Sequence, residues 1–271
     1  MGETFYEPLA DGRYEATELT RGPWDPGHQH AGPPAALIGR EVERLGGGCV
    51  GGPDGMTAQV GRITYEVMKP VPIGVLRVDA RVVRPGRRVE MFEAQLTDDG
   101  GEVLMRAQGW RLRREQVSFE RPPGIPDPPG GPDAGEPGEF FPTGYDTGYH
   151  TAMEYRFLEG AFMEPGPATV WMRMAVPLLP DEEPTPLQRV LVAADSGNGV
   201  SAPLDWRRYL FINVDLSVHL NRMPEGEWVC LDAVTIPEHD GIGISDAALF
   251  DRRGPIGRAA QTLLVGDREP G

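Results

Sequence analysis

The chain has 271 residues, enough for two domains of ordinary size, each with its own hydrophobic core. Its formal net charge is −15 and its basic residues form no contiguous run, which argues against nucleic acid or an anionic membrane as a partner. No uncharged apolar run approaches the ~20 residues that span a bilayer, and the N-terminus lacks the features of a signal peptide. Its two cysteines, Cys49 and Cys230, indicate no disulfide framework, so we expect a soluble cytoplasmic protein.

Hydrophobic periodicity predicts one helix and several strands in the first half of the chain. A strand over 13–20 precedes a helix over 35–45, with Pro33 or Pro34 in the first helical turn, where a missing N–H costs little. Further strands are expected over 57–68, 75–83, 89–97 and 102–113. Because Pro-Gly and Asp-Gly turns separate the last three of these, the pattern predicts an antiparallel meander.

Residues 115–150 differ in composition from the segments on either side. They are rich in proline, glycine and acidic residues, which predicts a linker without regular structure. The end of this segment, residues 139–150, is rich in aromatic side chains. We therefore expect that end to dock on the first domain or to cover a groove.

The second half repeats this plan. Strands are expected over 152–160 and 168–177, a helix over 185–199, and strands over 211–222, 227–236 and 244–265. The strand over 211–222 alternates throughout. This alternation predicts one apolar face and one polar face, made respectively of Ile212, Val214, Leu216, Val218 and Leu220, and of Asn213, Asp215, Ser217 and His219.

The two halves therefore form an internal repeat. The segment HAGPPAALIGREVER (30–44) has a counterpart in TPLQRVLVAADSG (185–197), and Pro72 and Gly74 fall on Pro224 and Gly226, a shift of 152 residues. One helix followed by a run of strands, present twice, is the plan of a double hotdog. We predict an α+β fold of two tandem hotdog domains, each with a curved antiparallel sheet wrapped around one helix. Their predicted bounds are 1–114 and 151–271, with the linker over 115–150.

Three polar residues in the second half are candidates for a catalytic site. Asp195 lies near the end of a mostly apolar helix, where an acid has the wrong sign for the helix dipole and needs hydrogen-bond donors. Asn213 and Gln261 lie on expected neighbouring strands. Taken singly, each has a plainer interpretation as a solvated helix-end acid or a strand amide facing solvent. Together, one acid and two amides can hold a water molecule and accept its proton.

These segments resemble the TesB-like acyl-CoA thioesterases (acyl-CoA thioesterase II), a double-hotdog family. The resemblance covers most of the chain outside the linker and depends on four motifs, QHAGPPAALIGRE, AADSGNG, INVDLSVHLNRMPEGEWVCLDA and GPIGRAAQTLLV. In that family an Asp, a Thr or Ser, and a Gln hold the hydrolytic water. The resemblance implies these roles for Asp195, Asn213 and Gln261. The chain departs from the family at Asn213, because an amide can orient water but cannot relay a proton as a hydroxyl can.

The repeat predicts a degenerate twin of this site in the first half. A shift of 152 to 153 residues places Asp195 on Glu43, Asn213 on Gly61 and Gln261 on Gln108. The first half then keeps an acid and a Gln but lacks the middle group. We therefore predict one working site, built on the second half.

A thioester hydrolase also needs a donor for the carbonyl oxygen. The backbone N–H of Gly32, at the start of the first helix, is the candidate, because helix N-termini carry partial positive charge and glycine permits close approach. An equally plain interpretation is that Gly32 only makes the turn into the helix. His30 lies beside it, and a lone histidine is more often structural.

Other chemistries find little support. The three arginine pairs 87–88, 207–208 and 252–253 are candidates for CoA phosphates, although each is typical of a solvated turn. The HQH segment (28–30) has no third ligand at metal-site spacing, so no metal and no cofactor are predicted. Neither a GxSxG motif nor a Cys–His pair indicates a covalent hydrolase.

The sequence therefore predicts hydrolysis of an acyl-CoA thioester to a carboxylic acid and CoA by water that Asp195 activates. Two alternatives stay open. One is an acyl-CoA or lipid-binding protein without turnover, which the departure at Asn213 favours slightly. The other is an enoyl-CoA hydratase or dehydratase on the same fold; such enzymes pair an Asp with a His, and the second helix contains no His. Because hotdog units often assemble through their sheets, we also expect a homo-oligomer.

Overall fold

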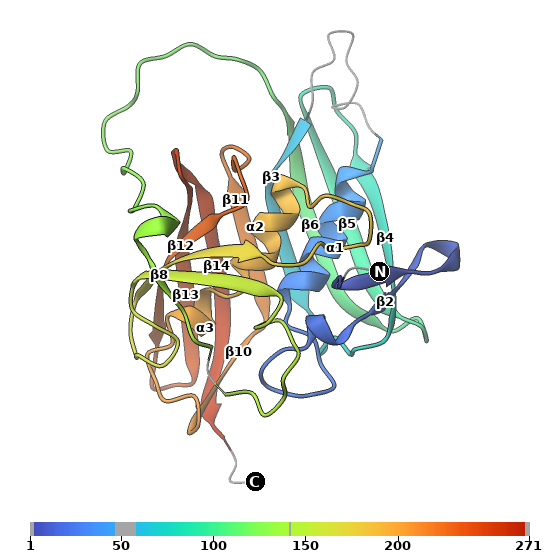
Figure 1. Cartoon of the computed structure of the whole chain (residues 1–271). Coiled ribbons are helices and arrows are strands. Elements are labelled where there is room, and N and C mark those ends of the chain that lie inside the picture. The colour runs from blue at the N-terminus through green and yellow to red at the C-terminus, as the bar shows by residue number, and fades with distance from the viewer. Residues whose placement is uncertain (1–2, 47–57, 141, 269–271) are drawn as a thin grey trace.

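The computed structural model describes residues 3–46, 58–140 and 142–268 (Figure 1). Across those ranges, fourteen strands form one sheet, and every pair of neighbouring strands is antiparallel. Cys49 lies outside the described residues, and Cys230 is a buried free thiol. None of the helices in these ranges is long and apolar enough to cross a membrane.

The first half contributes six strands and one long helix. The helix α1 begins at Gly32 and ends at Glu43, and both prolines lie in its first turn, as predicted. Its strands lie in the order β1-β2-β4-β5-β6-β3. They are β1 (Tyr6–Pro8), β2 (Arg13–Ala16), β3 (Ala58–Val67), β4 (Val75–Arg84), β5 (Val89–Asp98) and β6 (Val103–Arg113).

The second half has the same strand order. From the middle of the sheet outward, β11-β14-β13-β12-β9 in the second half corresponds to β3-β6-β5-β4-β2 in the first. The helices α2 (Pro186–Ala194) and α3 (Gly197–Val200) lie between β9 and β10 in the chain. The strands are β8 (Met153–Glu159), β9 (Ala168–Met174), β10 (Tyr209–Asn213), β11 (Asp215–Leu220), β12 (Val229–Pro237), β13 (Ile242–Asp251) and β14 (Gly254–Asp267).

The connecting segment is more regular than its composition predicts. It contains a short 3-10 helix (Pro132–Ala134) and the strand β7 (Glu136–Pro137), which pairs with β8. Gly138 extends this pairing, because its N–H donates to the carbonyl oxygen of Tyr155 at 3.1 Å. The prediction of no regular structure over 115–150 is therefore wrong for this short stretch.

The end of that segment docks on the first half of the chain. Arg21 donates to the carbonyl oxygen of Thr147 at 3.0 Å, and its guanidinium lies over the ring of Tyr145. The hydroxyl of Tyr145 donates to the carbonyl oxygen of Gly22. These contacts fix the course of the backbone that leads to Tyr149.

The pairing of β3 with β11 joins the two halves into one sheet. Thr64 lies opposite Ser217 in this pair, and their hydroxyl oxygens are 3.0 Å apart. Because the strands of each half continue outward from this pair, the halves are held edge to edge (Figure 1). The helices α1 and α2, one from each half, also pack against each other.

The strand predicted over 211–222 is wrong in one respect that matters for the site. It divides at Val214 into β10 and β11, and the register against β14 shifts by one residue between Asn213–Leu263 and Ser217–Ala260. An extra residue in one strand reverses the side chains beyond it. Ile212 and Val214 are therefore 50% and 45% exposed, and Asn213 points to the inner side of the sheet instead of the outer one.

The helices α1 and α2 pack against each other in opposite directions. The first turn of α1 lies so close to the end of α2 that a Cβ on Gly32 would lie 2.4 Å from the carbonyl oxygen of Val192. Further along, a Cβ on Gly39 would meet the side chain of Leu191. This contact brings the start of α1 and the end of α2 to one place.

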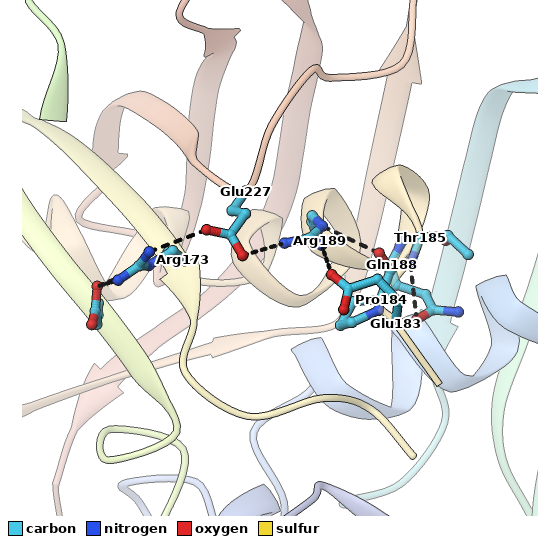
Figure 2. Close-up of polar contacts among 8 residues, drawn as sticks. Arg173, Glu183, Pro184, Thr185, Gln188, Arg189 and Glu227 are labelled. Carbon is cyan, nitrogen blue, oxygen red and sulfur yellow. Dashed lines mark hydrogen bonds and ion pairs between the residues drawn. The ribbon is translucent and has the colours of Figure 1, made fainter. Parts of the chain in front are cut away.

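A capping box and a chain of ion pairs fix the start of α2 (Figure 2). Gln188 donates its N–H to the Thr185 hydroxyl at 3.2 Å, and Thr185 donates its own N–H to the Gln188 side chain. The buried Arg189 lies between Glu183 and Glu227, and Glu227 also pairs with Arg173 of β9. These contacts tie α2 to the sheet and limit its movement along its own axis.

We expect Gly32→Ala to lower the free energy of unfolding by about 1–3 kcal/mol, because the added Cβ would force α1 away from the Val192 carbonyl. Gly46→Ala, beyond the other end of α1, is the matched control, since its Cβ would meet nothing within 4 Å. Denaturant unfolding of both variants measures the difference. Equal stabilities would contradict the close packing of the two helices.

Candidate active site

Asp195 lies where the second long helix ends. The single helix predicted over 185–199 divides here into α2 and α3, and Asp195 is the residue that caps α2. Its side chain is 5% exposed. A buried carboxylate at a helix C-terminus meets the negative end of the helix dipole, so it is stable only with several hydrogen-bond donors.

Two amide side chains supply donors to one oxygen of this carboxylate. Asn213 Nδ2 and Gln261 Nε2 lie 2.9 and 3.0 Å from Asp195 Oδ1. The orientation of the Gln261 amide is fixed, because its oxygen accepts the backbone N–H of Asn198 at 3.2 Å. The sequence predicted that these amides hold a water together with Asp195. In the structure they donate to the carboxylate itself.

The other carboxylate oxygen faces a histidine from the first half of the chain. His30 Nδ1 lies 3.0 Å from Asp195 Oδ2, and the histidine side chain is 13% exposed. Burial lowers the pKa of His30, and the negative charge of Asp195 opposes that shift only in part. The imidazole is therefore neutral near pH 7.

Tyr149 holds the imidazole from its other side. Its ring stacks on that of His30 with centroids 3.7 Å apart and an interplanar angle of 8°. The Tyr149 hydroxyl donates to the carbonyl oxygen of Val192 at 2.8 Å and lies 2.9 Å from Ser196 Oγ. Burial raises the pKa of this hydroxyl well above its usual range, so it stays protonated.

The sequence assigned no role to Tyr149 and treated His30 as structural. No periodicity or spacing in the sequence links His30 or Tyr149 to Asp195. His30 reaches Asp195 only because α1 packs on α2, and Tyr149 reaches the site by stacking on His30. The predicted set of Asp195, Asn213, Gln261 and Gly32 thus omits a side chain from the first half, His30, which reaches Asp195.

Gly32 lies beside these groups, at the first residue of α1. Its backbone N–H points at His30 Nδ1 over 3.1 Å. The same nitrogen faces Asp195, so it cannot accept from Gly32 and donate to Asp195 at the same time. The two contacts compete, and the protonation of Nδ1 decides which one forms.

The first-half counterparts of the site, predicted to be a degenerate twin, do not form a cluster like that around Asp195. Glu43 is exposed and accepts a hydrogen bond from the Thr185 hydroxyl at 2.7 Å. Gln108 lies on the outer face of the sheet, where it lines an open polar depression with Arg62 and Glu93. Gly61 lies at an irregularity of β3. Because Glu43 bonds to Thr185 at the end of α1 while Gln108 lies on the outer face of the sheet, the two side chains do not share one site.

The arginine pairs differ in how far they are already engaged. Arg252 and Arg253 form ion pairs with Asp133 and Glu225. Arg207 and Arg208 instead lie over the rings of their neighbours Trp206 and Tyr209, at one side of the C-terminal half. Of the two pairs, 207–208 retains more capacity to bind a phosphate.

An apolar pocket adjoins the Asp195 cluster. It is lined mainly by aromatic side chains, namely Trp24, Phe162, Trp206 and Phe211, with Asn198, Gly199 and Ala202. Asn198 connects the pocket to the cluster, because its backbone N–H donates to Gln261. Phe211 lies two residues before Asn213 on β10, so both side chains point to the inner side of the sheet.

Most of the chain matches two models of one protein family. Residues 20–112 match the model of the acyl-CoA thioesterase N-terminal domain, and residues 120–265 match that of the acyl-CoA thioesterase C-terminal domain. A comparison with curated proteins found no match.

Solved structures share the fold along nearly the whole chain. A protein described as a thioesterase II from Thermobifida fusca is 16% identical, with 97% of this chain and 96% of that chain covered and a TM-score of 0.72. A hot dog protein of Alicyclobacillus acidocaldarius is 15% identical, with 97% and 96% covered and a TM-score of 0.69. The acyl-CoA thioesterase II TesB2 of Mycobacterium marinum is 14% identical, with 98% and 95% covered and a TM-score of 0.64. These likenesses show a hot dog fold.

We expect the pKa of His30 to lie below its ordinary 6.5, because burial disfavours the imidazolium. Asp195→Asn should lower it further, since the variant removes the negative charge that favours the protonated ring. Titration of the histidine signals by NMR measures both values, and the His30→Asn spectrum identifies the signal by its absence. A His30 pKa above 6.5, or one that Asp195→Asn leaves unchanged, would contradict this environment.

Proposed function

Because the chain belongs to the acyl-CoA thioesterase family and is a thioesterase, we propose that it hydrolyses an acyl-CoA to a carboxylic acid and CoA at Asp195. One observation supports this site above all. Asn213, Gln261 and His30 converge on a single buried carboxylate from β10, β14 and the approach to α1. The cluster stabilises a buried carboxylate, and buried charges of this kind are concentrated at functional sites.

In this proposal each residue has one role. The negative charge of Asp195 drives removal of a proton from the attacking water. Asn213 and Gln261 hold the carboxylate in position, so an amide at position 213 is sufficient where the family has a hydroxyl. The Gly32 N–H donates to the developing oxyanion, a contribution of about 2.7–4 kcal/mol in other acyl-transfer enzymes.

We further propose that the two halves are tandem hotdog domains, over 1–114 and 151–271, joined by the linker over 115–150. The matching strand orders β2-β4-β5-β6-β3 and β9-β12-β13-β14-β11 support this division. So does the position of one long helix after the first strand of each set. Self-association and a cytoplasmic location stay predictions from the sequence.

The aromatic pocket is proposed as the site of the acyl group; it is narrow in this structure, so its side chains must move apart to admit an acyl chain. It is apolar, it adjoins Gln261 through Asn198, and Phe211 places its inner wall beside Asn213. The arginines at 207 and 208 follow Trp206 directly and are the candidates for binding CoA phosphates.

Asp195→Asn should lower kcat for thioester hydrolysis by about 10²–10⁴-fold, because the neutral amide cannot drive proton removal. A panel of acyl-CoAs from C2 to C18, with one aryl and one enoyl thioester, measures free thiol and enoyl absorbance in parallel. Asp232→Asn, the same change on an exposed strand position that bonds Thr169, is the matched control and should keep full activity.

Each result of that panel has one meaning. Thiol release that Asp195→Asn retains would remove Asp195 from the mechanism. Loss of enoyl absorbance without thiol release would instead indicate a hydratase, an alternative that the His30–Asp195 contact favours because it supplies the histidine that the second helix lacks.

Phe211→Ala should shift the acyl preference toward longer chains, because it enlarges the aromatic pocket. Each additional buried CH₂ contributes about 0.8 kcal/mol, so kcat/KM for long chains relative to short ones should rise about fourfold per added methylene accommodated. Phe119→Ala, at a side chain that is 74% exposed, is the control. An unchanged chain-length profile would move the acyl site elsewhere.

A further inference from the structure

The carboxylate of Asp195 is more fully occupied by protein than a direct water-activating base should be. Oδ1 accepts from both Asn213 and Gln261, which uses both of its lone pairs. Oδ2 faces the imidazole of His30 at 3.0 Å. A water that approached Asp195 directly would have to compete with these partners.

In contrast to the carboxylate of Asp195, the imidazole of His30 keeps one polar atom that the described part of the protein does not occupy. Its ring is fixed on one side by Tyr149 and at Nδ1 by Asp195, and its backbone N–H donates to the Thr20 carbonyl at 2.8 Å. Among the residues that the structure describes, Nε2 makes no hydrogen bond with protein. The ring is therefore held rigidly, with one basic nitrogen that no described protein group occupies.

We propose that His30 is the catalytic base, and that Asp195 acts through it by orienting the ring and stabilising the imidazolium. This inference rests on the proposed thioester hydrolysis and assigns its proton transfers. Nε2 takes a proton from water as the water oxygen bonds to the thioester carbonyl carbon. When the tetrahedral intermediate collapses, the C–S bond breaks and the same proton passes from Nε2 to the CoA sulfur, so the products are a carboxylic acid and free thiol.

The competition at Nδ1 fits this assignment. An ionised Asp195 3.0 Å from Nδ1 requires a proton on that nitrogen, because two lone pairs at this distance repel. With Nδ1 protonated, the Gly32 N–H loses its acceptor and becomes available to a thioester oxygen. One tautomer of His30 thus provides both a basic Nε2 and a free oxyanion donor.

The surroundings of His30 support its use as a base near neutral pH. The titratable groups that face it are Asp195, from the end of α2, and Tyr149, from the segment before β8. Burial lowers the pKa of His30, so the ring is unprotonated and able to accept at pH 7. Tyr149 stays neutral through the same range, since burial raises its pKa.

His30→Asn separates the catalytic role from a positioning one. The Asn amide can occupy the place of Nδ1 and still donate to Asp195, but it has no counterpart of Nε2. We expect kcat to fall by about 10²–10⁴-fold with KM little changed, measured by free thiol with the best acyl-CoA of the panel. His28→Asn, two residues away and exposed, is the matched control and should keep the wild-type rate.

The variant His30→Ala provides a second test, because added imidazole should restore part of its activity. Wild-type activity in His30→Asn, or no rescue of His30→Ala, would overturn the inference. If the variants fail to fold in thermal unfolding, the wild-type pH profile decides. The acidic limb of kcat must coincide with the pKa that NMR gives for His30, and activity that is constant through that pKa would overturn the inference.

These outcomes separate the two proposals. Loss of activity in Asp195→Asn together with full activity in His30→Asn leaves the thioesterase site in place and removes His30 as the base. Full activity in both variants removes the site itself.

Discussion

The buried carboxylate of Asp195 is the constraint on which the rest of the site depends. It lies at the negative end of α2, where neither the helix nor the hydrophobic core favours a charge. Each hydrogen bond to a charged group contributes about 1.5–3 kcal/mol, so three donors can offset the cost of burial. Removal of one donor leaves part of the charge uncompensated. The position of Asp195 therefore depends on β10, β14 and the approach to α1, which carry the donors.

Two features of the fold bring those donors together. The shift in register between β10 and β11 turns Asn213 toward Asp195, and the close contact of Gly32 with the Val192 carbonyl places His30 at the same point. The docking of the linker end on Arg21 then supplies Tyr149 behind the imidazole. The proposed site is therefore shared by both halves and the segment that connects them, although its acid and both amides come from the second half.

Much of the fold could be predicted from the sequence, because it depends on local pattern. The alternation over 75–83 and the turns that follow it are set by neighbouring residues, and β4 and β5 begin at the predicted residues 75 and 89. The predictions were wrong where one extra residue changes which side chains of a strand face inward. A period of two cannot reveal an extra residue at Val214, so the inner and outer faces of β10 were exchanged. The repeat shift of 153 residues placed Gln108 opposite Gln261, although Gln108 faces outward.

Asp195, Asn213 and Gln261 were found together because an acid near the end of an apolar helix and amides on apolar strands are visible as departures from pattern. The sequence by itself thus determined the repeated order of elements, the helix ends and three of the polar groups. Only the tertiary structure decided that the amides bind the carboxylate and that His30 and Tyr149 complete the cluster. The physical reason is that these contacts join residues from distant parts of the chain through helix packing and strand register, and neither leaves a periodic signal in the sequence.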